Sequence, residues 1–129
     1  MGQAKPTEWT YVGNIPAKNI ERTRRFYEDV LGLEVLGEGP SGIAYRSGST
    51  AFYLYPTDTA GTAEHTLGAF SVTDLDAAMA ELRSRGVEFE EYDTPELKTV
   101  DGVGDLGAGG RAAWFRDPEG NILSLAEVG

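Results

Sequence analysis

The chain has 129 residues, a length that fits one compact domain, and acidic residues outnumber basic ones by 21 to 11. The formal charge of -10 and a pI near 4.4 argue against binding to a nucleic-acid backbone. The lack of cysteine excludes disulfides, thiol catalysis and cysteine-ligated metal.

The first half of the chain predicts one strand, one helix and three further strands. Residues 8–15 mix aromatic and aliphatic side chains as strands do. Asn19 is a suitable helix N-cap, apolar residues follow it at helical spacing, and Gly32 is a suitable stop. Further strands are expected over residues 33–36, 42–46 and 49–55.

The second half repeats this order. Asp74 is the second N-cap and Gly86 the second stop, which places them 55 and 54 residues after Asn19 and Gly32. Strands are expected over residues 66–72, 87–92, 111–116 and 122–126, with a turn over 117–121. A tandem repeat of this length predicts a single domain, residues 1–129, that contains two βαβββ modules.

The two modules, about residues 8–56 and 65–127, predict an α+β fold. Their sheets would be curved and open and would together form a cup, with one helix behind each sheet. Residues 93–110 interrupt the repeat with five glycines and few large apolar side chains. This segment is either a lid over the cup or a solvated connection.

The expected helix and turn over 19–33 contain Phe26-Tyr27 and Leu31-Gly32-Leu33, and residues 115–123 form the closing hairpin. The second helix is followed by Gly86-Val87. These segments, the hairpin more specifically, resemble motifs of the vicinal oxygen chelate superfamily, which contains glyoxalase I, extradiol dioxygenases and bleomycin-type resistance proteins. The resemblance covers most of residues 9–127 and implies the same cup-shaped fold.

Metal-using members of this superfamily place four ligands on inward strand positions. The positions that correspond here hold Val12, Tyr53, Leu67 and Ser124, none of which is a conventional ligand of a divalent metal. His65, the single histidine, would reach such a site only if the register of its strand slipped. The resemblance therefore favours the metal-free, bleomycin-resistance-like branch, and we expect no metal and no cofactor.

Strand periodicity predicts which side chains line the cup. Phe52, Leu54 and Phe70 would face the helices, and their neighbours would face inward. The predicted ligand-binding residues are Val12, Asn14, Tyr45, Tyr53, Tyr55, His65, Leu67, Trp114 and Ser124. This mostly aromatic lining suits a flat, aromatic or apolar small molecule, although the same aromatics could instead fill the interior as core.

Three functions are open at this point. The first is metal-independent binding of a small aromatic or apolar molecule, of the kind that sequesters a toxic natural product in antibiotic resistance; the resemblance implies a homodimer. The second is a glyoxalase-like lyase or isomerase, or a dioxygenase, acting on a small oxygenated substrate, with His65 available as a base. The third is a scaffold with a collapsed cup.

Neither nucleic acid nor a membrane is an expected partner. The longest apolar run, residues 51–55, is too short to cross a bilayer. The first twenty residues lack an apolar signal region, so the expected location is the cytoplasm.

Overall fold

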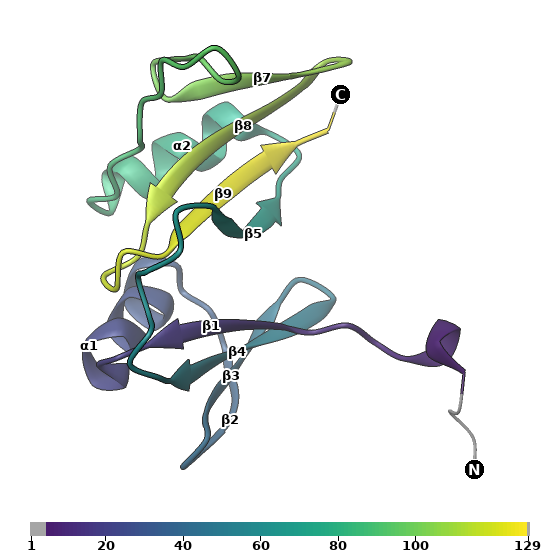
Figure 1. Cartoon of the computed structure of the whole chain (residues 1–129), viewed down its shortest axis with the longest axis vertical. Helices are drawn as coiled ribbons and strands as arrows, with labels where there is room; N and C mark the ends of the chain where they lie inside the picture. The colour runs from purple at the N-terminus through teal and green to yellow at the C-terminus, as the bar shows by residue number, and fades with distance from the viewer. Residues whose placement is uncertain (1–4, 129) are drawn as a thin grey trace.

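The computed structural model describes residues 5–128, which form two open sheets with a helix against one face of each (Figure 1). The α+β fold predicted from the sequence is confirmed. The first sheet has the order β1-β4-β3-β2, from β1 (Gly13–Ala17), β2 (Val35–Gly39), β3 (Gly42–Ser47) and β4 (Thr50–Pro56). The second has the order β5-β9-β8-β7-β6, from β5 (Thr66–Ser71), β6 (Thr99–Val100), β7 (Val103–Gly107), β8 (Gly110–Arg116) and β9 (Ile122–Glu127). The pairs β1–β4 and β5–β9 are parallel, and the other pairs are antiparallel.

The two helices begin where the sequence predicts. The Asn19 side chain accepts a hydrogen bond from the Arg22 amide at the start of α1 (Ile20–Arg25), which continues as a π-helical turn, Phe26–Val30. The Asp74 side chain accepts one from the Ala77 amide at the start of α2 (Leu75–Ser84). Each cap satisfies an amide that has no partner within its own helix. No helix in the described part of the chain is long and apolar enough to cross a membrane.

Three predicted strands differ in the structure. The strand expected over residues 33–36 is β2, which spans Val35–Gly39. The first strand begins at Gly13 rather than at residue 8, because Pro6–Glu8 forms a 3₁₀ helix and the chain before Gly13 extends away from the sheet (Figure 1). Residues 87–92 make only one bridge, between Phe89 and Phe115. Residues 110–112 of that edge of β8 pair with β7 instead, and β7 belongs to the segment predicted as a loop.

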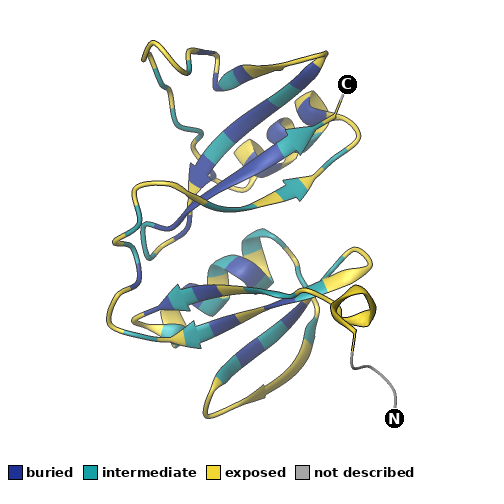
Figure 2. Cartoon of the chain, turned by 45° about the vertical axis from the view of Figure 1, so that its right-hand side comes forward, coloured by how far each residue is buried: buried dark blue, intermediate teal, exposed yellow. Residues whose placement is uncertain are grey.

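The core lies between the sheets and the helices that cover them (Figure 2). In the first half, the rings of Tyr27, Tyr45 and Phe52 contact one another with centroids 5.7–5.8 Å apart. Phe26 and Phe115 link this group to the second half, with centroids 6.2 Å apart. The two halves therefore share one continuous hydrophobic core.

A turn of the second half joins the two halves on the helix side. The carboxylate of Asp117 accepts hydrogen bonds from the buried Tyr27 hydroxyl at 2.6 Å and from the Asn121 side-chain amide at 3.0 Å. The same Asn121 amide donates to the Pro16 carbonyl at 2.8 Å. Burial and the neighbouring Asp117 charge raise the pKa of Tyr27, so its hydroxyl remains a donor. The turn thus satisfies polar groups of the first half that water cannot reach.

Glu119, in the same turn, accepts hydrogen bonds from residues at the N-terminus of α1. Its side chain is 2% exposed; it accepts hydrogen bonds from the Asn19 amide at 2.9 Å and the Thr23 hydroxyl at 2.8 Å, and Arg22 lies 3.2 Å away. Burial alone would raise the pKa of this carboxyl, but its donors and Arg22 together hold the pKa below the ordinary value of 4.5. The folded state therefore favours ionised Glu119.

This shift predicts how acid destabilises the protein. The contribution of Glu119 is fully present above its ordinary pKa and is lost as the pH falls through the lower pKa of the folded state. We expect Glu119→Gln to reduce the free energy of unfolding at pH 7 and to flatten its decline between pH 5 and pH 3, measured by urea unfolding at each pH. An acid limb as steep as that of the unchanged protein would show that other carboxylates dominate.

Candidate functional site

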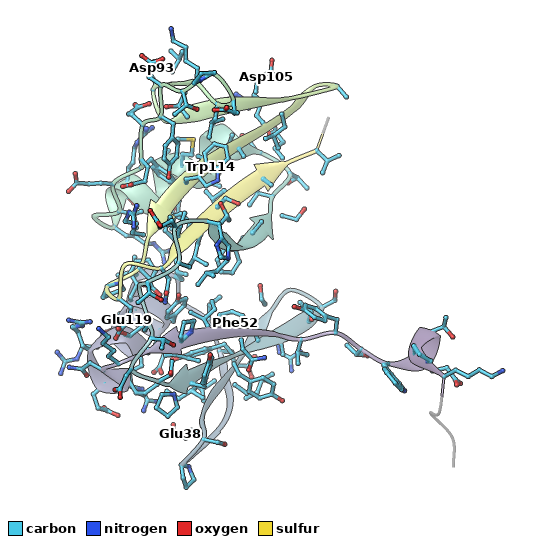
Figure 3. The ribbon with its side chains drawn as sticks, in the orientation of Figure 1. Glu38, Phe52, Asp93, Asp105, Trp114 and Glu119 are labelled. Carbon is cyan, nitrogen blue, oxygen red and sulfur yellow. The ribbon has the colours of Figure 1, made fainter. Side chains whose placement is uncertain are left out.

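Trp114 lies on the face of the second sheet that is turned away from α2. It sits on β8 directly opposite Ser124 of β9, and Ser124 is paired in turn with Ala69 of β5. Its neighbours in sequence, Ala113 and Phe115, are fully buried on the opposite face. Figure 3 shows Trp114 over this sheet and Phe52 in the other half of the molecule. The predicted inward direction of Trp114 therefore agrees with the structure.

The indole of Trp114 is held at both ends. Its Nε1 donates a hydrogen bond to the Thr66 hydroxyl at 3.1 Å, across β9. The other end lies over Gly104 of β7, where a Cβ would come within 2.9 Å of Cζ3. The ring thus spans the sheet from β7 towards β5, which accounts for the 4% exposure of Ser124 beneath it. Trp114 itself remains partly accessible.

Tyr92 makes an aromatic corner with Trp114. The two ring centroids are 5.7 Å apart and the planes meet at 87°, so the two rings make a T-shaped contact. Burial raises the pKa of Tyr92, the nearby charge of Glu90 adds to the shift, and Arg116 opposes it. Glu90 and Arg116 form an ion pair at 3.0 Å. The corner therefore offers two aromatic surfaces, a neutral tyrosine hydroxyl and a compensated pair of charges.

The corresponding face of the first sheet carries Asn14 and two tyrosines. Asn14 of β1 and Ala44 of β3 flank Tyr53 of β4, which is 43% exposed. Tyr55 lies two residues further along β4, on the same face and partly buried. The structure therefore brings Asn14, Tyr53 and Tyr55 together on one sheet and Trp114 with Ser124 on the other.

A cleft of about 400 Å³ lies where β1 and β5, the edge strands of the two sheets, approach each other. Its floor includes Phe52 and Phe70, whose rings meet edge to face at 6.3 Å. Asn14 and Leu67 are the predicted site residues that line it. Leu67 lies at an irregularity in the β5–β9 register. Its side chain packs partly against the core and also lines this cleft. The cleft volume is within the range of small-molecule sites.

The prediction for Tyr45 is wrong. Tyr45 is fully buried on the helix side, where its ring stacks on Tyr27 and its hydroxyl donates to Glu28 at 2.8 Å. Tyr45 is paired directly with Phe52 across β3 and β4, and directly paired residues share a face. Since Phe52 faces the helix, Tyr45 does too.

Two other predicted residues lie outside the strands. Val12 precedes β1, and His65 precedes β5 in an exposed bend, so His65 is not on the strand with Leu67 as predicted. Among residues 5–128, no group of three or more histidine, aspartate or glutamate side chains is placed to hold a metal ion. Val12, Tyr53, Leu67 and Ser124 carry no carboxylate or imidazole, so their side chains do not fit the divalent metal that the superfamily commonly uses.

Three residues of the aromatic corner were not predicted: Thr66, Tyr92 and Gly104. Gly104 lies in the segment that was predicted as a loop or lid, and Tyr92 directly precedes it. Local periodicity does not reveal that this segment pairs with the edge of β8. Thr66 was missed because strand alternation, which put Leu67 inward, turned Thr66 towards the helix. The irregularity between Thr66 and Gly68 instead places Thr66 opposite Ile122, on the face of Trp114.

Solved structures with a similar fold include proteins whose names indicate different functions. A bleomycin resistance determinant encoded on transposon Tn5 has 20% identity and a TM-score of 0.71, with 92% of this chain and 97% of that chain covered. An antibiotic binding protein, TnmS3 from Streptomyces sp. CB03234, has 24% identity and a TM-score of 0.65, with 94% and 98% covered. A lactoylglutathione lyase from Agrobacterium tumefaciens has 19% identity and a TM-score of 0.68, with 95% and 96% covered. At these identities the likeness establishes the fold alone.

A search among curated proteins found no match. The sequence profile described as Glyoxalase/Bleomycin resistance protein/Dioxygenase superfamily matches residues 10–125, which is most of the chain and includes both repeats and the closing hairpin. The chain belongs to the glyoxalase/bleomycin resistance protein/dioxygenase superfamily.

Proposed function

We propose that the protein binds a small, flat aromatic or apolar molecule without a metal and without altering it chemically, in the manner of proteins that sequester a toxic natural product. The observation that carries this proposal is the Trp114 indole, which is fixed by Thr66 and Tyr92 and yet remains partly accessible. A fixed aromatic face loses little conformational freedom when a ligand stacks on it. A stacked pair of aromatic rings contributes about 0.5–1.5 kcal/mol in addition to the contribution of the apolar area that it buries.

The chemistry of the inward positions supports binding over catalysis. The four positions where metal-using relatives place their ligands hold Val12, Tyr53, Leu67 and Ser124, none of which is a carboxylate or an imidazole. His65 lies in an exposed bend before β5 and not on the strand itself. The Tn5 bleomycin resistance determinant and TnmS3 share the fold and are named for binding or resistance, which is compatible with this proposal. A homodimer, which the superfamily resemblance implies, is part of the proposal and is tested by light scattering.

The two tryptophans of the chain allow a clean binding assay. In a Trp9→Phe background, Trp114 is the remaining tryptophan, and we expect polycyclic aromatic compounds to quench its fluorescence. Trp114→Ala should then raise Kd at least tenfold by titration calorimetry, a loss of about 1.4 kcal/mol. Trp9→Phe alone is the control and should leave Kd unchanged.

Three results would contradict the proposal. The first is a panel of planar aromatic compounds of which none binds. The second is a Trp114→Ala variant that folds and binds with the Kd of the unchanged protein. The third is one equivalent of a tightly held divalent metal in the purified protein, which would favour an enzyme.

A further inference from the structure

We infer that Gly104 is a positioning residue: the absence of a side chain there fixes the tilt of the Trp114 indole and hence the width of aromatic ring that the corner accepts. This inference rests on the proposed function for its ligand, but not for the orientation of the ring.

The backbone does not require glycine at position 104. The glycines of this chain with positive φ are at other positions, so the conformation of Gly104 is open to any residue. Gly104 is paired with Ala112 of β8, two residues before Trp114 and on the same face. What distinguishes the position is space: a Cβ would lie 2.9 Å from Cζ3 and 3.2 Å from Cη2 of Trp114.

The indole would have to give way to such a Cβ. Its other close neighbour would be Cδ1 of Leu97, also at 2.9 Å, and that atom is the end of a flexible side chain that can rotate aside. The indole is one rigid plane, held by Thr66 at Nε1 and by the T-shaped contact with Tyr92. A methyl group at position 104 would therefore tilt the ring and break its contact with Thr66 or with Tyr92.

The tilt of Trp114 governs what can stack in the corner. In the present orientation the indole lies over the sheet and Tyr92 stands at nearly a right angle to it, so a flat ligand can contact both rings at once. A raised indole would narrow this corner. The loss of affinity should increase with the size of the ligand's fused-ring system, because wider ring systems need the whole indole face.

The test is Gly104→Ala, with Gly37→Ala as its matched control. A Cβ at Gly37, on β2 of the other sheet, meets nothing within 4 Å, and Gly37 also lacks a positive φ. We expect Gly104→Ala to change the near-ultraviolet circular dichroism of Trp114 in the Trp9→Phe background and to raise Kd for a three-ring ligand at least tenfold. Kd for a one-ring ligand should change less than threefold. Gly37→Ala should change neither quantity.

A second variant keeps the inference testable if Gly104→Ala folds poorly. Thr66→Val removes the acceptor for Nε1 and should reproduce both effects, whereas Thr66→Ser keeps the hydroxyl and should restore the spectrum and the Kd. An unchanged spectrum in Gly104→Ala and Thr66→Val would overturn the inference, whatever the ligand result. A changed spectrum in a protein that binds no aromatic compound would contradict the proposed function and support the role of Gly104 in orienting the ring.

Discussion

Asp117→Ala should lower the free energy of unfolding by about 3–5 kcal/mol, the largest effect expected from a single side chain in this protein. The carboxylate accepts four hydrogen bonds: from the Tyr27 hydroxyl, from the Glu119 amide, and from the backbone and side-chain amides of Asn121. Asp117 is 5% exposed, and Tyr27 and Asn121 are fully buried. Removing the carboxylate leaves these donors without partners where water does not reach them.

The measurement is urea unfolding followed by far-ultraviolet circular dichroism, with Asp74→Ala as the control. Asp74 also accepts an amide hydrogen bond, but it is an exposed helix cap, so its loss should cost about 1 kcal/mol. Equal losses in the two variants would show that Asp117 acts only as a local turn former.

Gly61→Ala is the second large effect, and it acts through the backbone. Gly61 has a φ of +77°, and a Cβ there would overlap the Glu119 carbonyl oxygen. Gly61 also donates its amide to the Asn121 side chain at 3.1 Å, so the segment cannot move away without breaking that bond. We expect the free energy of unfolding to fall by at least about 3 kcal/mol, because the left-handed conformation disfavours alanine and the closing turn is displaced.

Gly48→Ala separates these two causes. Gly48 also has a positive φ, +56°, but a Cβ there meets nothing within 4 Å. Gly48→Ala should therefore lower the free energy of unfolding only by the cost of the left-handed conformation, about 1–2 kcal/mol. If the two variants melt at the same temperature, the contact between residue 61 and the closing turn does not contribute.

The sequence was sufficient for features with a local signal. The caps Asn19 and Asp74 and the stops Gly32 and Gly86 depend on the conformation of a few adjacent residues, and the structure has them where predicted. Tyr45 was assigned to the wrong face although a local signal existed. The two-residue link Gly48-Ser49 pairs Ser47 with Thr50, and counting back along both strands brings Tyr45 opposite Phe52.

The aromatic corner needed information that local patterns do not contain. Trp114 was assigned to the correct face by strand alternation, but its partners come from segments 48 residues earlier and 10 to 22 residues earlier in the chain. Gly104 in particular reads as a loop glycine until β7 is known to lie beside β8. Long-range packing decides such contacts, so they follow only from the folded structure.

The closing turn also has a consequence for the order in which the chain folds during synthesis. The first sheet is complete once residue 56 has been made, yet the Tyr27 hydroxyl receives its acceptor only with Asp117. Strand β5 pairs with one strand, β9, which begins at Ile122. A nascent chain therefore carries an unfinished first half and an unpaired β5 until nearly the whole domain has left the ribosome. Folding then ends in one late, long-range step, and until that step the unpaired β5 is open to pairing with other chains.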